Sequence, residues 1–245
     1  MGRVICITSG KGGVGKTFLC ANVAAELARG GVRVLCVDCS VGARDLDMVL
    51  GVSDRALYHL SDAVTGRCDP MTAIIPHPEI SCLSVLPAPQ YYSPQDFEGG
   101  APQRLIDALR DEFDVILLDG ASGLDARAGI AMEVCDGAII VVEPTPSSIR
   151  MADFAASRLM QAGKREMRIV VNRIDPVAMK KGLCPNVDNI IDSLSIGIIG
   201  AVPARAAYMT ARAGFTSERT PFANIAARLC SRHVPLMRFN RVNQW

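Results

Sequence analysis

Residues 10–17 combine four glycines, two lysines and a threonine in a spacing suited to binding a polyphosphate. They read Gly-Lys-Gly-Gly-Val-Gly-Lys-Thr and satisfy the phosphate-loop pattern of glycine, four free positions, glycine, lysine and then serine or threonine. Glycines let the backbone turn tightly and direct its N–H groups at phosphate oxygens. Lys16 is then expected to bind the β- and γ-phosphates, and Thr17 to offer its hydroxyl to Mg²⁺. The predicted nucleotide-binding residues of this loop are Gly10, Lys11, Gly12, Gly13, Val14, Gly15, Lys16, Thr17 and Phe18.

The segments on either side of this loop agree with that interpretation. Residues 4–7 form an apolar, β-branched run that predicts a buried strand, and residues 21–28 read as a helix. The amino end of a helix carries a partial positive charge that stabilises a bound phosphate. A strand, a glycine-rich loop and a helix in this order are the context that the motif requires.

Strand-like runs recur along the chain, with helix-like segments between most of them. Continuous apolar strands that alternate with helices indicate a mainly parallel sheet covered on both faces. We therefore predict a three-layer, doubly wound α/β fold whose ligands lie at the carboxyl ends of the strands. The predicted strands are residues 4–8, 32–37, 83–86, 115–118, 138–142, 168–171 and 196–201.

Two carboxylates follow predicted strands at the edge of the sheet where the phosphate loop must lie. Asp38 ends the second strand and Asp119 ends the fourth. Residues 115–119 read Val-Ile-Leu-Leu-Asp, which is the form of a Walker B strand whose acid holds Mg²⁺ through water. The predicted magnesium ligands are therefore Thr17, Asp38 and Asp119.

Composition limits the class of protein. The chain has 245 residues, of which 49% are hydrophobic and 21% charged, and its net charge is +1. This length suits one α/β domain, which we assign to residues 1–232, followed by a tail over residues 233–245. No apolar run approaches the roughly 18 residues of a membrane span, and no secretory signal precedes the first strand. The nine cysteines form no disulfide framework, which indicates a reducing, cytoplasmic setting.

The C-terminal end of the chain is basic, with seven arginines against the single acid Glu218 from residue 201 onward. Such an end suits an anionic partner, either a membrane surface or nucleic acid, unless acids from elsewhere in the chain neutralise it. The tail mixes arginine with phenylalanine and tryptophan, which suit the headgroup zone of a membrane. Pro235 and the lack of one apolar stripe oppose a regular amphipathic helix. The tail is therefore either an interfacial segment or a packed or frayed end.

The second lysine of the loop, Lys11, adds a further feature to the motif. With it, the loop resembles the deviant Walker A motif of the MinD/ParA family of ATPases, and the resemblance covers nearly the whole chain. The other segments that carry it are Asn-Val-Ala at 22–24, the segment 37–47, Pro-Thr-Pro-Ser-Ser-Ile-Arg at 144–150, Val-Asn-Arg at 171–173 and Gly-Ala-Val-Pro at 200–203.

This resemblance implies roles for particular residues. In the family, the lysine that matches Lys11 contacts phosphate across a homodimer that encloses two ATP molecules. The asparagine that matches Asn172 recognises adenine, and the backbone near Pro203 lines the base pocket. Arg173, which follows Asn172, is also predicted to bind the nucleotide. An amide can both donate to and accept from a purine edge, so the chemistry fits. Residues 37–47 resemble switch I, and Gly-Ala-Ser-Gly at 120–123 resembles switch II.

The chain departs from the family pattern at two places. The family usually has Asp-x-Asp in switch I, whereas this chain has Asp38-Cys39-Ser40. The second aspartate helps to orient the attacking water, and a serine lacks its charge and basicity. We therefore take Lys11, Lys16 and Ser40 as the catalytic set and expect slow hydrolysis. Phe18 replaces the usual threonine or serine and leaves the Mg²⁺ ligand Thr17 intact.

Two weaker signals invite other interpretations. Cys36 and Cys39 have C-x-x-C spacing, and related ATPases include iron–sulfur carriers, but one pair supplies only two thiolates and Cys36 is expected in the core. His77 and His233 show no ligand spacing, so both are expected at the surface.

The sequence therefore predicts a MinD-like switch that binds ATP and Mg²⁺, dimerises and acts in placing a division or other cell-surface apparatus. Its expected partners are a second copy of the chain, a protein regulator or activator, and an anionic membrane on whose inner face it would lie. Two alternatives remain open. One is a ParA-like segregation protein that binds DNA through its basic end. The other is a non-catalytic, ATP-dependent scaffold, motivated by Ser40.

Overall fold

The strands of the chain form one sheet in the computed structural model, which describes residues 1–91, 93–121, 123, 126–210, 213, 216 and 218–236. Within these residues the sheet has eight strands in the order β3-β4-β2-β5-β1-β6-β7-β8. All neighbouring strands are parallel except β3 and β4. The strands are β1 (Arg3–Thr8), β2 (Val34–Asp38), β3 (Ile75–Pro76), β4 (Leu83–Leu86), β5 (Val115–Asp119), β6 (Gly137–Val142), β7 (Glu166–Ile174) and β8 (Ile198–Pro203).

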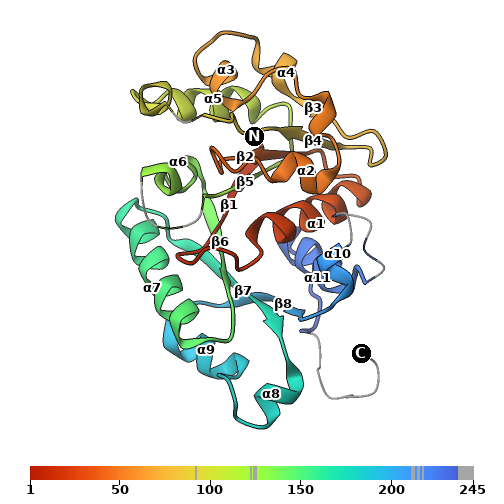
Figure 1. Ribbon diagram of the computed structural model, residues 1–245, viewed down its shortest axis with the longest axis vertical. Coiled ribbons are helices and arrows are strands. Elements are labelled where there is room, and N and C mark those ends of the chain that lie inside the picture. The colour runs from red at the N-terminus through yellow and green to blue at the C-terminus, as the bar shows by residue number, and fades with distance from the viewer. Residues whose placement is uncertain are drawn as a thin grey trace.

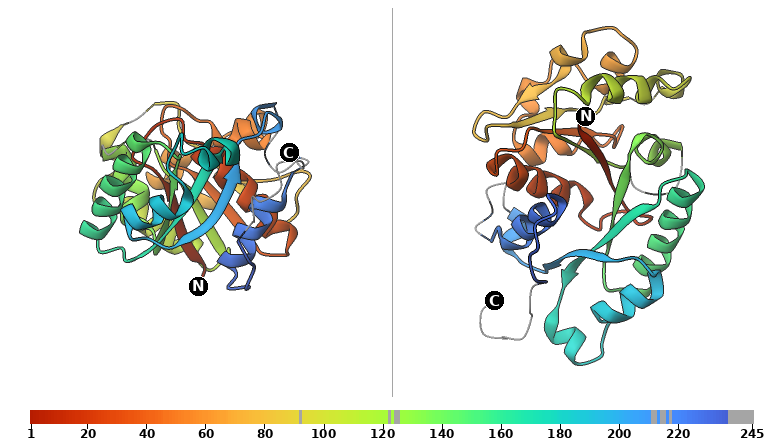
Figure 2. Two further views of the ribbon diagram at one scale, coloured as in Figure 1. Left: turned by 90° about the horizontal axis from the view of Figure 1, so that it is seen from below. Right: turned by 180° about the vertical axis from the view of Figure 1, so that it is seen from behind.

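Helices cover both faces of this sheet, as Figures 1 and 2 show. One face packs against α1 (Lys16–Arg29), α2 (Leu46–Leu50) and α11 (Thr220–Leu229). The other face packs against α3 (Leu60–Val64), α4 (Pro70–Ala73), α5 (Ala101–Leu109), α6 (Ala126–Val134), α7 (Pro146–Gln161) and α9 (Val187–Leu194). The remaining short helices are η1 (Ser53–Arg55), η2 (Pro94–Phe97), α8 (Pro176–Lys180) and α10 (Ala207–Thr210). The predicted three-layer, mainly parallel α/β fold is confirmed.

The central strand β1 explains where a ligand would bind. Its neighbours are β5 on one side and β6 on the other, and the chain leaves β1 to wind first toward β2 and later toward β7. Val4, Ile5, Cys6 and Ile7 are buried on both faces of the sheet, which is why the strand reads as a continuous apolar run. In such sheets the crevice beyond the carboxyl ends of the strands, where the winding reverses, is the usual binding site.

Some details differ from the sequence prediction. The prediction missed β3, which has only two residues and pairs antiparallel with β4 at the edge of the sheet. It was also wrong about His77, which is buried. Its Nε2 lies 3.1 Å from the carbonyl oxygen of Leu50, and its Nδ1 accepts from the backbone N–H groups of Glu79 and Ile80. The ring therefore satisfies the polar backbone of a tight loop. His233 is exposed.

Three of the C-terminal arginines are engaged within the fold. Arg205 pairs with Glu218 at 2.8 Å, and Arg219 pairs with Glu26 at 2.6 Å. Arg228 donates hydrogen bonds to three backbone carbonyls, those of Ile199, Val234 and Pro235. These three arginines are therefore neutralised or hydrogen-bonded within the chain, which argues against their forming a free basic surface for an anionic partner. No helix in the described part of the chain is both long and apolar enough to cross a bilayer.

Candidate functional site

The phosphate loop joins the end of β1 to the start of α1 and lies at the carboxyl edge of the sheet (Figure 1). Gly13 and Gly15 have φ angles of 74° and 91°, which residues with side chains rarely adopt. At Gly10 a Cβ atom would lie 2.1 Å from the carbonyl oxygen of Met151, so glycine is needed where the loop meets α7. The Ser9 hydroxyl donates to the carbonyl oxygen of Lys11 at 2.6 Å and closes the turn. Val14 anchors the loop because its side chain is buried, whereas Gly12 and Gly13 are exposed.

Lys16 opens α1 and lies inside the loop rather than on its surface. Only 5% of the residue is exposed, and its Nζ lies 3.5 Å from the Ser9 hydroxyl oxygen. Burial lowers the pKa of the Lys16 ammonium, while the negative charge of Asp119 opposes that shift. The half-buried Thr17 follows it on the first turn of α1. A buried ammonium and a hydroxyl at a helix amino terminus are groups that can hold an anion and its counter-cation.

Asp119 is the most unusual residue of this site. It ends β5, is fully buried, and neither of its carboxylate oxygens has a hydrogen-bond partner among the described residues. Burial raises the pKa of Asp119 to about 8, and the negative charge of Asp38 adds to the rise. The Thr17 hydroxyl and the Lys16 ammonium oppose it; the hydroxyl lies near without reaching hydrogen-bonding geometry. A buried polar group without a partner is costly, so these two oxygens point to a missing ligand.

Asp38 lies directly opposite Asp119 in the register of β2 and β5. Its two oxygens accept hydrogen bonds from the backbone N–H groups of Ser40, at 2.8 Å, and Leu46, at 3.2 Å. Burial raises the pKa of Asp38 to about 6, and these two amides oppose the rise. Asp38 thus shapes residues 39–46, the segment that resembles switch I. Ser40 is half-buried there, and its carbonyl accepts from the N–H groups of Ala43 and Arg44.

These observations allow a test of the predicted magnesium site. Hard divalent cations prefer carboxylate and hydroxyl oxygens. Asp119 offers two oxygens without partners beside the Thr17 hydroxyl, so Thr17 and Asp119 fit a Mg²⁺ ion. Asp38 is adjacent, and each of its oxygens accepts one amide N–H while keeping a second lone pair, so its place among the magnesium ligands stays a prediction. Ser122, in the segment that resembles switch II, lies outside the described residues.

The C-x-x-C spacing does not bring two thiols together. Cys36 packs on the face of the sheet that α1 covers, whereas Cys39 packs on the opposite face. Successive residues of a strand point to opposite faces, so an odd separation divides the pair. No group of three or more His, Cys, Asp or Glu side chains within the described ranges is placed to hold a metal ion.

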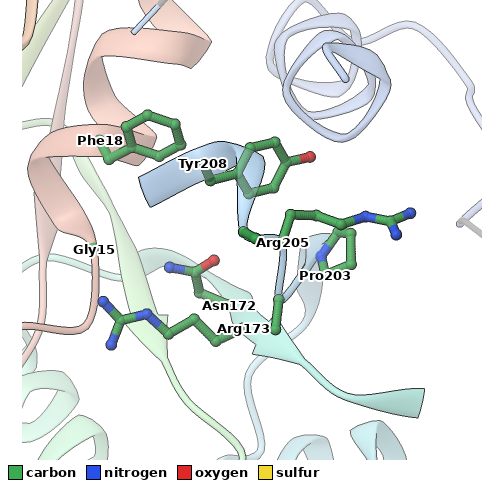
Figure 3. Close-up of a pocket in the computed structure, with 9 residues that line it drawn as sticks. Gly15, Phe18, Asn172, Arg173, Pro203, Arg205 and Tyr208 are labelled. Carbon is green, nitrogen blue, oxygen red and sulfur yellow. The ribbon is translucent and has the colours of Figure 1, made fainter. Parts of the chain in front are cut away.

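A cavity of about 490 Å³ opens beside the phosphate loop, as Figure 3 shows. Asn172, near the end of β7, is at its floor and donates from its Nδ2 to the carbonyl oxygen of Val14 at 2.7 Å. The amide oxygen of Asn172 lies on the side away from Gly15 (Figure 3). Besides Asn172, the lining includes Gly15, Phe18, Arg173, Pro203, Arg205 and Tyr208.

Two aromatic rings, those of Phe18 and Tyr208, line one side of this cavity, and the ring of Phe222 packs against both. The ring centroid of Phe18 lies 5.7 Å from that of Tyr208 and 5.8 Å from that of Phe222, and the last two are 5.5 Å apart. The Tyr208 hydroxyl donates to the carbonyl oxygen of Glu218, and burial raises the pKa of Tyr208 to about 12. A cavity lined by the aromatic rings of Phe18 and Tyr208, with an amide at its floor, suits a purine base. Phe18 thus lines the cavity beside the phosphate loop. Tyr208 also lines it, but it was not predicted because it belongs to none of the sequence motifs.

The mouth of the loop holds a second group that was not predicted. Glu143 follows β6, and its carboxylate pairs with both Lys11 and Arg173. The distances are 3.3 Å from Lys11 Nζ to Oε2 and 2.5 Å from Arg173 Nη1 to Oε1. Two of the predicted nucleotide-binding cations are therefore held by one internal acid. No local pattern marks Glu143, because its partners lie 132 and 30 residues away.

Comparisons with known proteins bear on this site. A family model described as the CobQ/CobB/MinD/ParA nucleotide binding domain matches residues 5–214. The septum site-determining protein MinD of Synechocystis is 32% identical over 248 residues, which cover 98% of this chain and 93% of that protein. The protein of the same name from Bacillus subtilis is 39% identical over 82% of this chain and 76% of its own length. A solved structure, the MinC:MinD cell division protein complex of Aquifex aeolicus, contains a chain that is 32% identical with a TM-score of 0.87, covering 96% of this chain and 98% of that one.

Proposed function

The chain belongs to the CobQ/CobB/MinD/ParA family of nucleotide-binding domains, and we propose that it is an ATPase switch of the MinD type. The observation that carries this proposal is Asp119. A fully buried carboxylate without hydrogen-bond partners, beside Lys16 and Thr17 at the carboxyl edge of the sheet, has the chemistry to receive a nucleotide-bound cation. ATP and Mg²⁺ are the proposed ligands.

The phosphate-binding step follows from the loop. Its backbone N–H groups and the amino end of α1 attract the polyphosphate, and the Lys16 ammonium lies buried where the loop folds around it. Thr17 and Asp119 would hold Mg²⁺, with Asp38 beside them. Bound Mg²⁺ neutralises charge on the phosphate oxygens. Because the pKa of Asp119 is raised to about 8, its carboxyl must lose a proton to solvent near neutral pH when it becomes a ligand.

The base and the dimer interface complete the proposed switch. Phe18 and Tyr208 offer aromatic surface to an adenine whose polar edge would meet Asn172. Lys11 is 38% exposed at the tip of the loop, next to the exposed Gly12 and Gly13, which leaves it able to reach a nucleotide in a second copy of the chain. We propose that ATP drives this homodimerisation.

Partners and rate are the finer part of the proposal. We propose that the dimer binds a protein regulator; the solved complex of MinD with MinC from Aquifex aeolicus supports a protein partner. We propose further that it acts in placing a division or other cell-surface apparatus from the inner face of an anionic membrane. Ser40 in place of a carboxylate favours slow hydrolysis, because a serine cannot take a proton near neutral pH. The same residue supports the second candidate, a scaffold that binds ATP without hydrolysing it.

Replacing Lys16 with alanine tests the proposal. Isothermal titration of the folded Lys16→Ala variant with ATP and Mg²⁺ is expected to show affinity at least about tenfold weaker than wild type, which corresponds to about 1.4 kcal/mol. The matched control is Lys180→Ala, which removes an exposed lysine at the end of α8. Equal affinity in Lys16→Ala and wild type would contradict the nucleotide site.

A further inference from the structure

We propose that Glu143 is a positioning residue that holds Lys11 and Arg173 when no nucleotide is bound and yields both cations to phosphates when ATP enters: Arg173 to the ATP in its own site, and Lys11 to the ATP of the second copy in the dimer. The carboxylate would then act as an internal competitor that weakens nucleotide binding. This inference rests on the proposed function, because it requires a polyphosphate at the loop.

The fold fixes Glu143 at the mouth of the phosphate loop. It comes directly after β6, which pairs with β1, the strand that leads into the loop. Its backbone N–H donates to the Ser148 hydroxyl at 2.9 Å, and its carbonyl accepts from the N–H of Thr145 at 2.7 Å. Only 11% of the Glu143 side chain is exposed. The backbone at Glu143 is therefore held by the start of α7, and the carboxylate has little freedom to leave.

The two cations are less constrained than the acid. The side chains of Lys11 and Arg173 are 38% and 50% exposed, and both reach the carboxylate from flexible stems. Arg173 has a φ angle of 56°, a left-handed conformation that is unfavourable for a residue with a side chain. It lies where the pairing of β7 with β8 shifts register between Val171 and Ile174. Figure 3 shows its guanidinium extending toward the phosphate-loop side of the cavity.

These facts place a carboxylate and an incoming polyphosphate in competition for the same donors. Lys11 and Arg173 are the two ion-pair partners of Glu143 within the described residues. Arginine and lysine both bind phosphate strongly, and a triphosphate has more acceptor oxygens and more negative charge than one carboxylate. Both cations should therefore prefer the triphosphate. The negative charge of Glu143 also repels the phosphates. Removing that charge while keeping the shape of the side chain should therefore free both cations and tighten binding.

The test is Glu143→Gln in the full chain, measured by isothermal titration with ATP and Mg²⁺ at constant ionic strength. We expect affinity roughly three- to tenfold tighter than wild type, the range set by partly exposed ion pairs. The gain should disappear when Glu143→Gln is combined with Lys11→Ala and Arg173→Ala, and affinity for adenosine should not change. The matched control is Glu166→Gln, which removes the acid paired with Arg3 at the start of β7, the opposite end of the sheet.

The outcomes separate this inference from the proposed function. Unchanged or weaker ATP binding in folded Glu143→Gln would overturn the inference, because the acid would then align the cations or have no role. If Glu143→Gln does not fold, Glu143→Asp serves instead. Aspartate keeps the negative charge, but its side chain is one methylene shorter, so the carboxylate lies farther from Lys11 and Arg173 and should hold them less well. ATP affinity should then rise above the wild-type value, and affinity at or below that value would again overturn the inference. If Lys16→Ala leaves ATP binding intact, the proposed function itself fails, whatever Glu143 does.

Discussion

Asp119 allows a quantitative prediction about the free protein. Its pKa is raised to about 8 in the fold, whereas an unfolded chain ionises this carboxyl near pH 3.9. Between those values the native state holds a proton that the unfolded state has lost. The free energy of unfolding must therefore fall as pH rises through this window, which is the reverse of the usual behaviour of an aspartate. Replacement by asparagine keeps the shape and removes the titration.

The size of the effect follows from linkage. One proton of difference changes the free energy of unfolding by about 1.4 kcal/mol per pH unit. From about pH 5 to about pH 8, where Asp119 is half ionised, wild-type protein should therefore lose about 4 kcal/mol relative to Asp119→Asn. Asp38, with a pKa raised to about 6, acts in the same direction but is present in both proteins. A loss of this size is a large part of the stability of an ordinary domain.

Urea unfolding of the nucleotide-free proteins at the two pH values measures this difference. Saturating Mg²⁺ and ADP should flatten the pH dependence of the free energy of unfolding of wild type, because the bound cation keeps Asp119 ionised in the native state. The same addition should not change the pH dependence of Asp119→Asn. If both free proteins lose stability equally between the two pH values, then Asp119 is already ionised in the empty site and the reasoning from its burial is wrong.

Three further predictions concern the proposed switch. Light scattering with a non-hydrolysable ATP analogue should detect a wild-type dimer and a Lys11→Ala monomer; a dimer that forms without nucleotide would contradict the switch. Deleting residues 237–245, which spares the carbonyls held by Arg228, should abolish pelleting with anionic liposomes in the presence of ATP; if the full chain does not pellet, the membrane proposal is wrong. Ser40→Asp should raise steady-state ATP turnover by roughly tenfold, equal to about 1.4 kcal/mol of barrier, and an unchanged rate would show that another residue positions the water.

The sequence predicted those parts of the fold that depend on local pattern. Parallel strands buried on both faces are continuous apolar runs, and their carboxyl ends share one edge. This is why Asp38 and Asp119 were expected near the phosphate loop, and the register of β2 and β5 sets them opposite each other. The loop itself was recognisable because its glycines, lysines and threonine lie within eight residues.

Other features depend on long-range packing that no local pattern records. The ion pair of Lys11 with Glu143 joins residues 132 apart, and it forms only because β6 is the neighbour of β1. Tyr208 reaches the cavity by packing on Phe18 and Phe222, which come from two different helices. Burial of His77 follows from a loop whose backbone needed polar partners, a requirement that the identity of one histidine does not reveal.

The placement of the acids suggests that the empty site carries its own counter-charges. Asp119 lies beneath the loop near Lys16, and Glu143 lies at its mouth against Lys11 and Arg173. Each acid is buried or nearly so, and each is unfavourably placed in one respect: Asp119 lacks hydrogen bonds, and Glu143 holds cations that a triphosphate would bind better. Mg²⁺ would resolve the first defect, and the phosphates would resolve the second. Nucleotide and metal should therefore bind cooperatively. The phosphates draw Lys11 and Arg173 away from Glu143 and leave its negative charge uncompensated, and the positive charge of Mg²⁺ offsets the negative charge that the phosphates add.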